Sequence, residues 1–102
     1  MTVALFVPDL MDRSRITAVA PDAVVVVGVG DLVAGPGDTV VVDLSRAGVL
    51  EAIARLVGCG ARVVGFGSHV DRPGLDAARD AGCEVFARSA FFSRIAEVLR
   101  VP

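Results

Sequence analysis

The sequence lacks lysine, tryptophan and tyrosine, and it contains a single histidine. All ten basic residues are arginine, whose side chain stays protonated near neutral pH. This excludes Schiff-base chemistry and general-base catalysis by lysine. The chain also lacks any apolar run near the roughly 20 residues that cross a membrane. Asp9, Asp12 and Arg13 interrupt the apolar residues at the amino end, so no secretion signal is expected. We therefore expect a cytoplasmic protein that does not contact a membrane.

Neither a strong net charge nor a cysteine framework is present. The net charge of −2 and the absence of a basic run give no attraction for nucleic acid. Cys59 and Cys83 lack Cys-x-x-Cys spacing, so we expect both to be buried apolar residues and not a disulfide or a metal pair. With 102 residues, 54% of them hydrophobic, the chain has the size and composition of one folded domain, residues 1–102.

Short apolar runs alternate with segments of helical periodicity along the chain. The apolar runs predict strands at residues 3–7, 23–27, 39–42, 62–66 and 84–87. The periodic segments predict helices at residues 10–19, 49–57 and 71–81, and a last helix whose inner stripe is Phe92, Ile95, Val98 and Leu99. Glycines and a proline within residues 30–38 leave room for one helical turn at most between the second and third strands.

This alternation predicts an α/β fold with helices on both faces of a parallel sheet, that is, a three-layer α/β/α sandwich. Five strands in this length favour the flavodoxin-like order 2-1-3-4-5, with a shortened or missing second helix. In that order the crevice at the carboxyl ends of the strands lies between the first and third strands. Asp9 and Asp43, which follow those strands, are expected to meet there.

Asp43 ends a wholly apolar strand, where open α/β sheets place their chemistry. Residues 41–48, residues 67–71 with 75–83, and residues 85–89 resemble three parts of the CheY-like receiver domains of two-component response regulators. The first segment resembles the phosphoacceptor strand and its loop. The second resembles the end of the fourth strand with the helix after it, and the third resembles the fifth strand with its basic position. The resemblance spans nearly the whole chain.

The resemblance implies a role for each residue at the carboxyl edge of the sheet. Asp43 would accept the phosphoryl group, and Asp9 and Asp43 would hold Mg²⁺. Ser68 would supply the hydroxyl that contacts the phosphoryl group, although the residue that aligns with the receiver Ser or Thr at the end of the fourth strand is Gly67. Arg88 stands where receivers have a lysine. The chain also departs from the family pattern, because only one acid follows the first strand and a serine replaces the proline after the basic residue.

The departures lead to a main hypothesis and two alternatives. We expect an atypical stand-alone receiver-like domain that binds a protein partner, is not an enzyme and needs no cofactor. In that case Asp43 is a solvated carboxylate at a strand end, paired with Arg88. One alternative is a functional phosphoacceptor receiver of a phosphorelay, with Asp43 as the acceptor and Mg²⁺ bound. The other is a flavodoxin-like module that binds a small molecule in the crevice.

Phe91 and Phe92 are neighbours on the last predicted helix, so we expect that both cannot face the core. Either one of them packs against the short fifth strand, or one is exposed and marks an interaction surface. The receiver resemblance implies that the face formed by the fourth helix, the fifth strand and the fifth helix carries a homodimer or partner contact.

Overall fold

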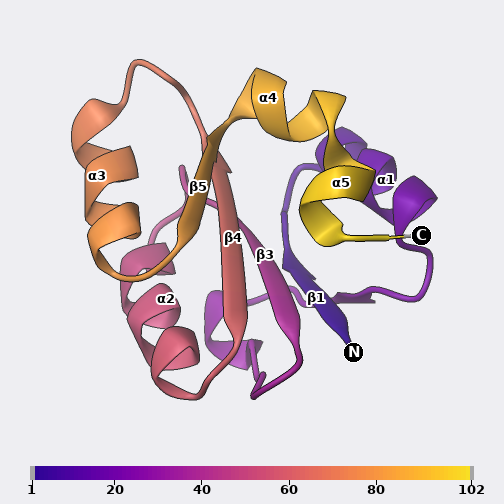
Figure 1. Ribbon diagram of the computed structural model, residues 1–102, viewed down its shortest axis with the longest axis horizontal. Coiled ribbons are helices and arrows are strands. Elements are labelled where there is room, and N and C mark those ends of the chain that lie inside the picture. The colour runs from indigo at the N-terminus through magenta and orange to yellow at the C-terminus, as the bar shows by residue number, and fades with distance from the viewer. Residues whose placement is uncertain (1, 102) are drawn as a thin grey trace.

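A parallel β-sheet forms the centre of the computed structural model, which describes residues 2–101 (Figure 1). The two end residues of the predicted 1–102 domain lie outside the described range. All four strand pairs are parallel, and the order is β2-β1-β3-β4-β5, which confirms the predicted topology. The strands are β1 (Val3–Phe6), β2 (Val24–Val25), β3 (Thr39–Asp43), β4 (Arg62–Gly67) and β5 (Glu84–Ala87).

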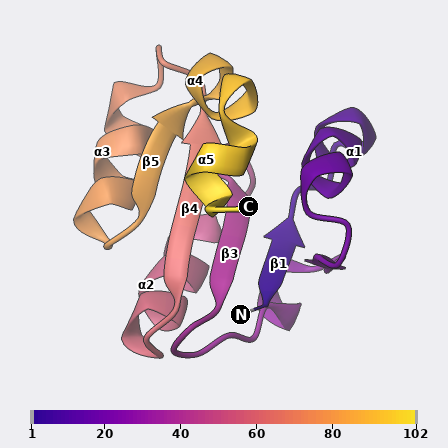
Figure 2. The same ribbon diagram turned by 45° about the vertical axis from the view of Figure 1, so that its right-hand side comes forward.

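Helices cover both faces of this sheet (Figures 1 and 2). On one face lie α2 (Val49–Gly58) and α3 (Arg72–Asp80). The other face carries α1 (Leu10–Val19) and α5 (Ile95–Leu99), and α4 (Arg88–Ser93) lies at the carboxyl end of the sheet. The central strand β3 serves both layers, because Val40 and Val42 face the α2 side while Val41 faces the α1 side.

The second connection is as short as the sequence predicts. A single turn of 3₁₀ helix, η1 (Val29–Asp31), is the only helical element between β2 and β3. Leu32, which follows it, is fully buried and packs in the same core as Val40 and Ile53. This one side chain therefore closes part of the face that a longer helix would otherwise cover.

Two elements differ from the prediction. The second strand has two paired residues instead of five, because β2 lies at the edge of the sheet and pairs only with β1 among the described residues. The last helix is broken at Arg94 into α4 and α5. The break lets α4 turn across the end of the sheet while α5 packs against the face that α1 covers.

Candidate functional site

The carboxylate of Asp43 lies at the carboxyl end of β3 and is held by the loop that follows it. Its Oδ1 accepts hydrogen bonds from the Ser45 backbone N–H at 3.0 Å and the Ser45 hydroxyl at 2.7 Å. Its Oδ2 accepts from Nε of Arg46 at 3.3 Å. Asp43 is only 4% exposed. The prediction of a solvated Asp43 paired with Arg88 is therefore wrong, since the nearer hydroxyl and guanidinium come from its own loop.

Arg88 instead binds Asp12, a residue that the sequence did not single out as functional. The guanidinium donates two parallel hydrogen bonds to the two carboxylate oxygens of Asp12, each 2.9 Å long. Asp12 is 7% exposed, and its hydrogen bond to Arg88 lowers the pKa of the Asp12 carboxyl. The same bond raises the pKa of Arg88, with smaller contributions from the charges of Asp43 and Asp9. The four groups therefore form one electrostatic cluster at the carboxyl end of the sheet.

Asp9 caps helix α1. Its Oδ1 accepts a hydrogen bond of 2.9 Å from the backbone N–H of Asp12, which places Asp12 in the first turn of the helix. Asp9 is exposed, whereas the Asp12 side chain turns toward Arg88. The spacing of two acids three residues apart after a strand was the sequence signal that could have suggested Asp12.

The hydroxyl that a receiver would place at the end of the fourth strand is not directed at Asp43. Ser68 is exposed, and its Oγ accepts a 3.3 Å hydrogen bond from the backbone N–H of Val70. Gly67 ends β4 and is buried, and a Cβ there would lie 3.1 Å from Cδ2 of Leu75. The register pairs Asp43 with Phe66, so Gly67 lies one residue beyond the position opposite the carboxylate.

Phe91 and Phe92 are both buried, at 0% and 9% exposure, so the expectation that both cannot face the core is wrong. Phe66 explains the difference, because it lies against both rings. The Phe66 and Phe91 rings stack with centroids 5.0 Å apart, and Phe92 meets Phe66 edge to face at 5.0 Å. The Arg88 guanidinium lies over Phe66 and Phe92, 5.4 Å and 5.1 Å from their ring centroids. Phe66 and Phe92 thus support Arg88, and Phe91 and Phe92 do not form an exposed apolar surface.

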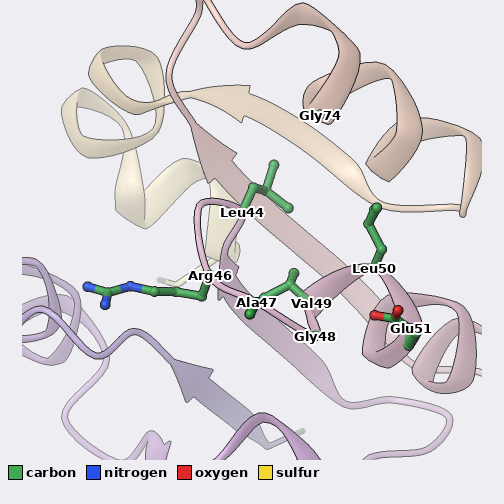
Figure 3. Close-up of a pocket in the computed structure, with 8 residues that line it drawn as sticks. All are labelled: Leu44, Arg46, Ala47, Gly48, Val49, Leu50, Glu51 and Gly74. Atoms are coloured by element: carbon green, nitrogen blue, oxygen red, sulfur yellow. The ribbon is translucent and has the colours of Figure 1, made fainter.

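A hollow of about 290 Å³ opens beside this cluster and not over Asp43 (Figure 3). It is lined by Leu44, Arg46, Ala47, Gly48, Val49, Leu50, Glu51 and Gly74. Figure 3 shows Arg46 pointing away from Leu50 and Glu51, on the opposite side of the loop. The hollow therefore lacks convergent polar groups of the kind that orient a small ligand.

The sequence also led to predictions on metal binding, on the two cysteines and on membrane spans. Within residues 2–101, no group of three or more His, Cys, Asp or Glu side chains is placed to hold a metal ion. Cys83 is buried, and burial raises the pKa of its thiol to about 12. Cys59 is exposed, which corrects the expectation that both cysteines are buried. No helix in the described part of the chain is long and apolar enough to cross a membrane.

Comparison with known proteins adds no family to this description. The chain matches no protein-family model, no curated protein and no solved structure. The comparisons therefore assign no family to the chain, and the resemblance to receiver domains stays a prediction from the sequence.

Proposed function

We propose that the protein is a receiver-like domain that acts by binding another protein and does not transfer a phosphoryl group. The observation that supports this most directly is that the two buried carboxylates at the carboxyl edge of the sheet are already neutralised by arginines of the same chain. Asp43 is bound by Arg46, and Asp12 is bound by Arg88.

A phosphoacceptor carboxylate needs an oxygen that can attack and a cation that reduces the repulsion from the incoming phosphoryl group. Both oxygens of Asp43 accept hydrogen bonds from its own loop, so an attacking oxygen would have to give up at least one of them. Arg88 has its two terminal nitrogens on Asp12, which leaves this guanidinium poorly placed to bind a phosphoryl oxygen. The chain thus keeps charges that a receiver would use, but these charges are paired with one another within the chain.

The alternative is a functional phosphoacceptor receiver, and one observation supports it. The Arg46 side chain is 43% exposed, and that of Arg88 is 45% exposed, so solvent reaches one side of each ion pair. If these arginines exchanged their partners for a phosphoryl group, Asp43 and Asp9 would be the oxygen ligands for Mg²⁺.

Incubation with Mg²⁺ and either acetyl phosphate or beryllofluoride distinguishes the two. We expect no mass increase of one phosphoryl group and no saturable beryllofluoride signal in ¹⁹F NMR. Asp43→Asn is the matched control, because it keeps the size of the side chain and removes the nucleophile. Saturable labelling of the wild-type protein that disappears in Asp43→Asn would overturn the proposal in favour of the phosphorelay alternative.

A further inference from the structure

The edge strand β2 is the least protected part of the sheet. It belongs to a run of four valines, residues 24–27, and three of them are exposed: Val24 at 51%, Val25 at 37% and Val27 at 92%. Proteins usually protect a sheet edge with charged side chains or proline. From Ala23 to Gly30 this chain has neither. Its short length is therefore the only feature of β2 that would hinder pairing with another strand, since charged side chains and proline are absent there.

The backbone of β2 presents hydrogen-bonding groups to the open side. The N–H of Val26 donates to the carbonyl of Leu5 on β1 at 3.0 Å, and the register pairs Leu5 with Val25. Successive residues of a strand direct their backbone groups to opposite sides, so Val24 and Val26 face β1. The N–H and C=O groups of Val25, and the N–H of Val27, consequently face away from the sheet.

We propose that a second copy of this chain pairs with β2 in antiparallel orientation, around a twofold axis at Val25. In that register the two Val25 residues exchange both of their backbone hydrogen bonds, and each Val27 N–H reaches the Ala23 carbonyl of the other copy. The Ala23 N–H is not needed, because it already donates to the Ala20 carbonyl at 3.1 Å. The two sheets then continue into one another.

The residues around Val25 suit a second copy as the occupant of this edge, because no like charges meet in the twofold register. Around Val25, Asp22 of one copy faces Gly28 of the other, so the carboxylate nearest to the strand does not meet its own equivalent. The side chains that do meet are valines, and β-branched side chains paired across strands stabilise a sheet. A twofold contact of this kind is closed, which limits assembly to a dimer.

This inference names the partner for the protein–protein contact proposed above, and in its functional meaning it rests on that proposal. The two can nevertheless fail separately. If the protein is a monomer and is not phosphorylated, the proposed β2 dimer is wrong, but the proposal that Asp43 does not accept a phosphoryl group stands. If the protein is a dimer and is phosphorylated on Asp43, the β2 dimer stands and the proposed function is wrong.

The twofold position makes a charge-exchange experiment possible. Val25→Lys alone and Val25→Glu alone each place two like charges directly opposite one another. We expect each to raise the dimer dissociation constant about tenfold or more. An equimolar mixture of the two variants should restore the dimer, because lysine then faces glutamate. Light scattering with refractive-index detection measures the mass, since the chain has no tryptophan or tyrosine for absorbance at 280 nm.

Two further variants complete the test. Val70→Lys charges a more exposed valine, 75% against 37% for Val25, in the loop between β4 and α3, and it should leave the dimer unchanged. Val27→Pro removes one backbone donor at a side chain that is 92% exposed, and it should weaken the dimer without a charge. Circular dichroism confirms that each variant is folded. A wild-type protein that is monomeric at several hundred micromolar, or a mixture of the Val25 variants that does not re-form the dimer, would overturn the inference.

Discussion

Replacing Arg88 by methionine tests the contact on which the proposed inert cluster depends. Methionine keeps an apolar stem over Phe66 and Phe92 but removes both hydrogen bonds to Asp12. Removing one partner of a fully buried ion pair costs about 3–5 kcal/mol, whereas an exposed pair contributes about 0–1 kcal/mol. The Asp12 side chain is 10% exposed and that of Arg88 is 45% exposed, so this pair lies between the two limits. We expect a loss of about 2 kcal/mol, or roughly 10 °C in Tm for a domain of this size.

Urea unfolding followed by circular dichroism at 222 nm measures the loss, because the chain has no tryptophan for fluorescence. The matched control is Arg79→Met, which breaks the pair between Arg79 and Asp76, whose side chains are 57% and 58% exposed. It should change the free energy of unfolding by less than about 0.5 kcal/mol. In a double-mutant cycle, Asp12→Asn and Arg88→Met should be coupled by about 1 kcal/mol or more. An Arg88→Met variant as stable as Arg79→Met would refute the reasoning.

The pH dependence of the same difference gives an independent check. Because Arg88 lowers the pKa of Asp12 in the folded protein, the stabilisation is fully present above the ordinary aspartate pKa of about 4. It is lost as the pH falls through the lower folded value. The stability difference between wild type and Arg88→Met should therefore shrink below pH 4. Arg62 also lowers the pKa of Glu84, but this contribution is the same in both proteins and cancels.

Three further variants or reagents test other parts of the structure. Asp43→Asn keeps one acceptor for its loop but loses the charge, so we expect a loss of about 1 kcal/mol in urea unfolding. A thiol reagent at pH 8 should modify one cysteine of the native protein, the exposed Cys59, and should modify both in urea, because burial raises the pKa of Cys83 to about 12. Gly82→Ala should lower the Tm by at least about 4 °C, because Gly82 has a φ of +101° and its added Cβ would lie 2.9 Å from Cγ1 of Val57.

The three central strands, β1, β3 and β4, could be predicted from sequence because they are almost entirely buried. In β3 all five residues are buried, and its middle is the apolar run of residues 40–42, which a strand covered on both faces requires. The single turn between β2 and β3 also followed from local chemistry, since glycine and proline prevent a longer helix there. The length of β2 could not be predicted from its run of valines. An edge strand extends only as far as it pairs with its neighbour, and β2 pairs with β1 at two residues.

The pairing of charges could not be predicted in the same way. Asp12 and Arg88 are 76 residues apart, and their contact depends on how α1 and α4 meet at the carboxyl end of the sheet. Several acids in the chain could have paired with Arg88, and the position of Asp43 at a strand end favoured the wrong one. Ser45 and Arg46 lie two and three residues from Asp43. Their hydrogen bonds to the Asp43 carboxylate therefore take the place of a contact with Arg88. The burial of Phe91 and Phe92 likewise depends on Phe66, a residue of β4.

Arg88→Lys separates the charge of this residue from its shape, at the position where the proposed receiver-like assignment would expect a lysine. An ammonium group keeps the positive charge, yet it cannot donate two parallel bonds in the fixed geometry of a guanidinium. It also lacks the planar group that lies over Phe66 and Phe92. We therefore expect Arg88→Lys to recover about half of the stability that Arg88→Met loses, in the same urea assay. Full recovery would show that charge alone holds Asp12, and the lysine of a receiver would then fit this cluster as well as arginine does.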